Sequence, residues 1–274
     1  MISKLTALFC DIDGTLTVEG GSLMPKTKQA LEKLHSQGVL IGIASGRPVD
    51  GRILGLASDW GLSFEFDAVI GMNGGELWDR FHEGVEKYHL LKKECTREIL
   101  TFLDGLDINA YIFEDGYDCI AALRMDETMK ESIRQNHSHV EIGDRDRLCA
   151  RDTGKLEVRY RPEDEEKVMR VVNAHHSDEW TAVRTYTGTV EFVDPAVNKG
   201  LALRMFSQRC GIPAEEIMGI GDMDNDIGLV RDAGWGVCMI SGSEKTKAAA
   251  DDITEYDVLH DGVGEYLEKN WFSA

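Results

Sequence analysis

The chain has 274 residues, of which 42% are hydrophobic and 29% charged, a balance typical of a soluble globular protein. Thirty basic and forty-nine acidic residues give a net charge of −19, which opposes binding to the phosphate backbone of nucleic acids. No stretch approaches the ~18–20 apolar residues that span a bilayer. We therefore expect neither a nucleic-acid nor a membrane partner. The sequence leaves both a monomer and a homodimer open.

Six cysteines are spread along the chain without a C-x-x-C pair, and several lie in apolar runs. This usage favours buried free thiols over disulfides or zinc ligands. The apolar stretch at the N-terminus is too short for a secretory signal. Together these features predict a cytoplasmic protein.

The first third of the chain alternates strand and helix signals. Apolar residues 5–10 predict a buried strand, and Pro25 and Gly38 bound a predicted helix. Residues 39–44 read as the next strand, followed by a helix with Pro48 near its start and a strand that ends at a glycine-rich turn. Such an alternation predicts parallel βαβ units.

The last third resumes this pattern. The segment 198–211 is predicted to form a helix that ends at Gly211, and strands are predicted over 216–221 and 234–240, before a short helix and a final one. The two thirds together predict an α/β core with a doubly wound, mostly parallel sheet, over residues 1–81 and 191–274.

The middle of the chain has a different pattern of predicted elements. Partly alternating strands are separated by helical segments near residues 92–104, 126–136 and 163–175. We therefore predict an inserted α+β domain at 82–190, built from a mainly antiparallel sheet with its helices on one face.

Four polar loops follow strands or begin a helix of the predicted core: "DIDGT", "SGRP", "NKG" and "GDMDND". Ligands of an open parallel sheet bind at the carboxyl ends of its strands, so the four loops predict one site. The site would combine ligands for a hard divalent cation, neutral donors for phosphate oxygens and one cation, which are the groups that phosphoryl transfer needs. The carboxylates are Asp11, Asp13, Asp222 and Asp226, the neutral donors are Ser45, the backbone N–H groups of the turn at Gly46 and Asn225, and the cation is Lys199.

Simpler interpretations exist for single motifs. The alternating acids of "GDMDND" suggest a calcium loop, but Ile227 and Ala233 stand where an EF-hand requires glycine and glutamate. Ser45 would also suit the cap of the following helix, a role compatible with phosphate binding at a helix N-terminus. Lys199 would be an unfavourable first-turn residue against the helix dipole, which favours a functional reason for it.

The four motifs, in this order, resemble those of the haloacid dehalogenase (HAD) superfamily, and the long insert resembles the large α/β cap of its Cof-type branch, subfamily IIB. The resemblance implies a Rossmann-like core and a cap that sets substrate specificity. It also implies a Mg²⁺-dependent phosphatase that hydrolyses phosphate monoesters of small metabolites, such as sugar phosphates, through an aspartyl-phosphate.

The resemblance also implies roles for single residues. Asp11 would be the nucleophile and Asp13 the general acid and base, and an acid at that second position argues against haloacids as substrates. Ser45, Gly46, Lys199 and Asn225 would hold the phosphate. The metal would be held by Asp11, the main-chain carbonyl of Asp13 and Asp222, with Asp226 mainly in the outer shell.

Two alternatives remain open from the sequence. A phosphomutase would use the same aspartyl-phosphate but return the phosphoryl group to its substrate. A non-catalytic metal-binding protein on the same fold is the other alternative, although the intact set Asp11, Asp13, Lys199 and Asp222 speaks against it.

Overall fold

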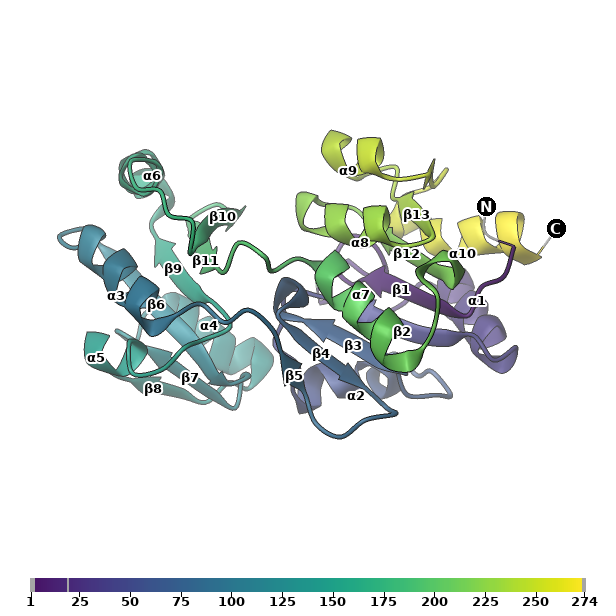
Figure 1. The fold of residues 1–274 in the computed structure, drawn as a ribbon, viewed down its shortest axis with the longest axis horizontal. Helices are drawn as coiled ribbons and strands as arrows, with labels where there is room; N and C mark the ends of the chain where they lie inside the picture. Colours follow the sequence, from purple (N-terminus) through teal and green to yellow (C-terminus); the bar gives the residue numbers. More distant parts are fainter. Residues whose placement is uncertain (1–2, 19, 273–274) are drawn as a thin grey trace. The chain divides into compact units, whose positions relative to one another are not determined.

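The computed structural model describes residues 3–18 and 20–272, which form two compact units (Figure 1). The first comprises Met1–Glu86 and Asn198–Ala274, and the second Lys87–Val197. The second unit thus begins five residues later and ends seven residues later than the expected insert at 82–190. The shift has a local reason, because strand pairing in the second unit continues to Val193 and the next helix of the first unit is capped by Asn198.

The first unit is built on an eight-stranded sheet in the order β14-β13-β12-β1-β2-β3-β4-β5. The pairs from β14 to β3 are parallel, and β4 runs antiparallel to β3. Its strands are β1 (Ala7–Asp11), β2 (Leu40–Ala44), β3 (Ala68–Gly71), β4 (Glu76–Asp79), β5 (Glu86–Lys87), β12 (Ile217–Gly221), β13 (Trp235–Cys238) and β14 (Asp252–Ile253). Its helices are α1 (Pro25–Ser36), α2 (Gly51–Asp59), α7 (Lys199–Cys210), α8 (Ile227–Asp232), α9 (Glu244–Ala249) and α10 (Gly262–Leu267).

Helices cover both faces of this sheet. On one face, Leu8 and Cys10 belong to the apolar core that α1, α2 and α10 complete. On the other, the ring of Phe9 meets that of Phe206 in α7 at a centroid distance of 4.9 Å. The side chains of neighbouring β1 residues therefore pack on opposite faces of the sheet, as strand geometry requires. The predicted doubly wound, mostly parallel core is confirmed.

One predicted helix starts later than expected. Pro48 lies outside α2, which begins at Gly51 because the side chain of Asp50 accepts hydrogen bonds from the backbone N–H groups of Arg52 and Ile53. An aspartate is among the strongest N-caps, and it fixes the helix start more firmly than a proline three residues upstream.

The second unit holds a six-stranded sheet in the order β10-β11-β9-β6-β7-β8, which is antiparallel except for the pair β7–β8. The inserted α+β fold is thus confirmed. The strands are β6 (Ile108–Asp115), β7 (Cys119–Ala122), β8 (Val140–Ile142), β9 (Leu156–Tyr160), β10 (Thr181–Tyr186) and β11 (Thr189–Val193). The helices are α3 (Lys93–Phe102), α4 (Glu127–Asn136), α5 (Arg145–Leu148) and α6 (Glu165–Asn173).

The helices of the second unit do not all lie on one face, so that expectation was wrong. Ile112 on β6 packs in the same core as α3, α5 and α6, whereas its neighbour Tyr111 packs with Met129 of α4. Adjacent strand residues point to opposite faces, so α4 covers the face opposite the other three helices.

All six cysteines are free thiols, four of them buried, as expected from their apolar surroundings. Among the described residues, no helix has both the length and the apolar character needed to cross a membrane.

Candidate active site

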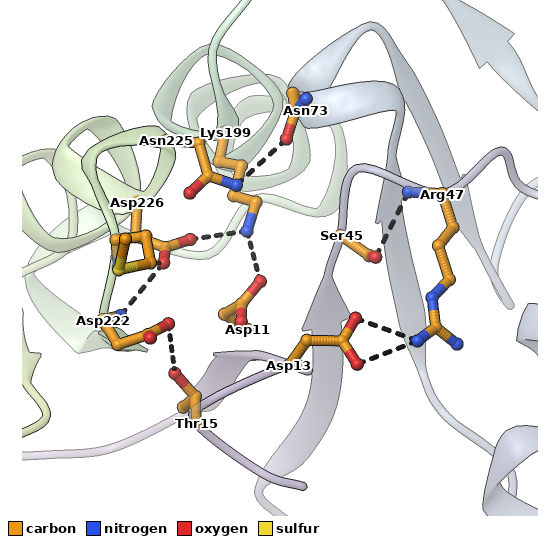
Figure 2. Close-up of polar contacts among 11 residues, drawn as sticks. Asp11, Asp13, Thr15, Ser45, Arg47, Asn73, Lys199, Asp222, Asn225 and Asp226 are labelled. Carbon is orange, nitrogen blue, oxygen red and sulfur yellow. Dashed lines mark hydrogen bonds and ion pairs between the residues drawn. The ribbon is translucent and has the colours of Figure 1, made fainter. Parts of the chain in front are cut away.

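The predicted site residues of the first unit meet at the carboxyl ends of three neighbouring strands, β12, β1 and β2 (Figure 2). Asp11 is the last residue of β1, Asp222 follows β12, and Ser45 follows β2. Parallel pairing brings these three ends to one edge of the sheet, although the residues lie far apart in the sequence.

A glycine makes the turn after β1 possible. Gly14 adopts a φ of 93°, and its N–H donates to the carbonyl oxygen of Thr17 at 2.7 Å. A Cβ at this position would overlap the carboxylate of Asp222. Gly14 therefore lets the turn approach the end of β12 closely, which no side-chain-bearing residue would allow.

Lys199 is buried between two carboxylates. It is the first residue of α7, whose N-cap Asn198 accepts a hydrogen bond from the N–H of Leu201 at 2.9 Å. Its Nζ lies 2.5 Å from Asp11 Oδ1 and 2.5 Å from Asp226 Oδ1, with 0% of the residue exposed. Burial opposes the charge of Lys199, but the two carboxylates outweigh that effect and raise its pKa.

Asp226 uses both carboxylate oxygens within the protein. Oδ1 contacts Lys199, and Oδ2 accepts the backbone N–H groups of Asp222 and Met223, each at 3.0 Å. Asp226 thereby fixes the lysine and shapes the loop after β12. The expected role of Asp226 in the outer metal shell stays a prediction.

The negative charge of the site exceeds its positive charge. Oxygens of Asp11, Asp222 and Asp226 lie within 4.8 Å of one another, all three residues are buried, and Lys199 contacts Asp11 and Asp226. Burial, followed by the charge of Asp226, raises the pKa of Asp11 well above its usual range and that of Asp222 to about 6. A set of hard oxygen donors with uncompensated charge fits a divalent cation such as Mg²⁺.

Two further contacts hold Asp222 in place. Thr15 Oγ1 donates to its Oδ1 at 3.3 Å, and the N–H of Ser243 donates to its backbone oxygen at 2.8 Å. Thr15 stands inside the motif "DIDGT", yet we did not single it out from the sequence, because its partner is more than 200 residues away.

Asp13 points away from Asp11 toward Arg47, a cation that is not among the predicted site residues. Arg47 Nη2 lies 2.9 Å from each oxygen of Asp13, and the two side chains are about one third exposed (Figure 2). The guanidinium fixes the direction of the carboxylate while leaving it accessible. Arg47 stands in the motif "SGRP" itself, which was the available signal.

The expected phosphate-binding residues Ser45, Gly46 and Asn225 make their own contacts within the site. Ser45 is almost fully buried, and its Oγ accepts the N–H of Arg47 at 3.2 Å. Asn225 Nδ2 donates to Asn73 Oδ1 at 3.2 Å, and a Cβ at Gly46 would lie 3.2 Å from that same oxygen. Asn73 lies in a turn, where it has a φ of 55°, and its side chain faces the site (Figure 2).

A doubly wound sheet whose strand ends gather acidic side chains around one lysine defines the chain as a Rossmann-like α/β enzyme. The model of the haloacid dehalogenase-like hydrolases matches residues 8–267. The chain therefore belongs to the haloacid dehalogenase-like hydrolase family, and the resemblance of the four motifs is confirmed.

Individual relatives cover the whole chain. It is 23% identical to the 5-amino-6-(5-phospho-D-ribitylamino)uracil phosphatase YitU of Bacillus subtilis, over 100% of both chains. A crystal structure from Thermotoga maritima superposes with a TM-score of 0.82 at 25% identity, covering 97% of each chain. The HAD subclass IIB sugar phosphatase BT4131 has a TM-score of 0.78 at 26% identity, covering 96% of this chain and 98% of its own.

Proposed function

We propose that the protein is a Mg²⁺-dependent phosphatase that hydrolyses phosphate monoesters of small metabolites through an aspartyl-phosphate on Asp11. The observation that carries the proposal is the placement of a buried carboxylate, Asp11, against Lys199, with a second carboxylate, Asp13, held apart by Arg47. A nucleophile and a proton carrier are thereby separate groups with separate environments.

In the first step, an oxygen of Asp11 attacks phosphorus and the bond from phosphorus to the ester oxygen breaks. Asp13 gives its proton to the departing alcohol. In the second step, Asp13 takes a proton from water, whose oxygen attacks phosphorus and releases phosphate from Asp11. Lys199 reduces the repulsion between the anionic nucleophile and the anionic substrate.

Phosphate oxygens would be bound by Ser45, the N–H of Gly46, Asn225 and Lys199. A Mg²⁺ ion would be held by Asp11, the main-chain carbonyl of Asp13 and Asp222, with Asp226 in its outer shell. When bound, the ion would supply positive charge to the transferring phosphoryl group. The raised pKa values of Asp11 and Asp222 support this assignment, since both carboxylates need a cation to ionise favourably.

A sugar phosphate or a similar phosphorylated metabolite is the proposed substrate class, supported by the similarity to a sugar phosphatase. The second unit would act as the cap that selects the leaving group. A cytoplasmic location is proposed from the six free thiols.

The test is a screen of phosphorylated metabolites with Mg²⁺, in which free phosphate and isomerised substrate are both measured. Phosphate release that disappears in Asp11→Asn and reversibly in EDTA supports the proposal. Isomerisation without phosphate release would establish a phosphomutase instead. Turnover of no substrate in the panel, with Mg²⁺ binding intact, would favour the non-catalytic alternative.

A further inference from the structure

A second group of metal-ligating side chains lies at the other end of α7 from Lys199. Strand β4 ends at Asp79, which is fully buried, and His82 follows three residues later. Helix α7 packs against β4 and ends at Cys210. Because α7 has 12 residues, Cys210 lies about 16 Å along the helix from Lys199.

The three side chains converge on one point. An oxygen of Asp79, a ring nitrogen of His82 and Sγ of Cys210 all lie within 4.8 Å of one another. Asp79 Oδ1 is 2.8 Å from His82 Nδ1 and accepts the N–H of Phe81 at 2.9 Å. Ligands of one tetrahedral ion need this proximity and only a small side-chain rotation to meet a common centre.

A neighbouring arginine orients the carboxylate. Arg209 Nε lies 3.1 Å from Asp79 Oδ2, and Arg209 Nη1 lies 3.0 Å from Glu86. Oδ2 thus forms an ion pair with the guanidinium, whereas Oδ1 is the oxygen next to His82. Partners of this kind, which fix the direction of a ligand, are typical of metal sites.

From these contacts we propose that Asp79, His82 and Cys210 form a second cation site, suited to Zn²⁺ or a similar borderline-soft divalent ion and separate from the carboxylate site at Asp11. Water would complete the coordination, since the His82 side chain is 39% exposed. A thiolate, an imidazole and one carboxylate suit Zn²⁺ and disfavour Mg²⁺.

The local charge supports such an ion. Asp79 and Glu86 carry two negative charges next to the single positive charge of Arg209. A divalent ion would drive the thiol proton into solvent, and its two positive charges would balance the thiolate and the excess carboxylate. The last turn of a helix also favours a cation.

Co²⁺ provides a spectroscopic probe, because a cobalt–thiolate bond gives an intense near-ultraviolet charge-transfer absorption that carboxylate ligands do not. The full-length protein is titrated with Co²⁺ in excess Mg²⁺, which occupies the carboxylate site. We expect the charge-transfer absorption to saturate at one Co²⁺ per chain, to be reversed by Zn²⁺, and to be absent in Cys210→Ser.

Two further variants make the assignment specific. Cys119→Ser removes the other half-buried cysteine and should leave the absorption unchanged. His82→Ala removes an exposed ligand and should weaken Co²⁺ binding by more than the about 10- to 100-fold that loss of an outer-shell partner costs. Hydrolysis of p-nitrophenyl phosphate in Mg²⁺, if the wild type catalyses it, should be unchanged in all three variants. Circular dichroism verifies their folding independently of activity.

Absence of the absorption in the wild type would overturn the proposal. So would its persistence in Cys210→Ser or unaltered Co²⁺ affinity in His82→Ala. None of these outcomes bears on the proposed phosphatase activity, because the spectra are recorded without substrate.

Discussion

At the residue scale, the site is organised by the environment of each carboxylate. Asp11, Asp222 and Asp226 share a buried region with one lysine, whereas Asp13 is paired with Arg47 and partly exposed. Burial penalises the ionised form of a carboxylate, and a neighbouring acid adds to the penalty. The surroundings of each aspartate therefore determine how readily its carboxylate ionises.

The raised pKa of Asp222 predicts that the metal-free protein has a lower free energy of unfolding at high pH than at low pH. Its pKa is about 6 in the folded chain and 3.8 ordinarily, so the folded state binds more protons between these values and loses stability as pH rises through that window. In EDTA at pH 8, Asp222→Asn should be more stable than wild type by about 3 kcal/mol, a difference that falls to about 0.5 kcal/mol at pH 4.

Urea unfolding of both proteins across this pH range measures the effect. Asparagine keeps the oxygen that Thr15 contacts, so the comparison isolates the charge. Saturating Mg²⁺ should reduce or reverse the difference. Equal stabilities at pH 8 in EDTA would contradict this account of the charge.

The forked contact from Arg47 to Asp13 predicts a positioning effect. Arg47→Ala should lower kcat for an alkyl phosphate by about 10²-fold, because a misdirected proton donor no longer reaches the leaving oxygen. Arg47→Lys should recover only part of the rate, since an ammonium group on a flexible stem orients the carboxylate less rigidly than the planar guanidinium does. Steady-state kinetics of the two variants decide this, and a wild-type kcat in Arg47→Ala would refute the positioning role.

At the element scale, the close approach of α7 and α8 depends on glycine residues at their contact. A Cβ on Gly200 would overlap the carbonyl oxygen of Gly228 in α8. Gly55 in α2 has open space around its Cβ position. Helix packing therefore requires a glycine at position 200 but not at position 55.

These glycines form a matched pair of substitutions. Gly55→Ala should stabilise the protein by about 0.5–1 kcal/mol, because alanine loses less entropy in a helix. Gly200→Ala should destabilise it by about 1–3 kcal/mol through overpacking. Chemical denaturation of both variants is the measurement, and a stabilising Gly200→Ala would show that α7 and α8 separate easily.

Elements with strong local signals were predictable, and short or context-dependent ones were not. The helix of α1, with its proline start, and α7, with its glycine end, follow from single residues in the sequence. The short elements β8, α5 and α8 have three, four and six residues, too few for a periodic pattern. The face on which α4 packs depends on tertiary contacts alone.

The candidate site shows the same division. The strand ends gave Asp11, Asp222 and Ser45 because topology requires such ends to meet. The contacts of Arg47 with Asp13 and of Asn73 with Asn225 depend on side-chain directions across loops, which no spacing in the sequence encodes.

At the scale of the whole molecule, every residue of the candidate site belongs to the first unit. We therefore expect Mg²⁺ to slow amide hydrogen exchange in the loops after β1 and β12, and to leave the strands β6 and β9 of the second unit unaffected. Exchange measured by mass spectrometry with and without Mg²⁺ tests this. Protection concentrated in the second unit would place the metal elsewhere.

The covalent role of Asp11 is the central claim, and Asp13→Asn tests it most directly. The p-nitrophenolate leaving group needs no proton, so this variant should still be phosphorylated by p-nitrophenyl phosphate but should lack the base for the second step. We predict a burst of one p-nitrophenol per chain and, after acid quenching, a hydroxylamine-sensitive phosphoryl group that maps to Asp11. A burst without label on Asp11, or a label on another residue, would contradict the account.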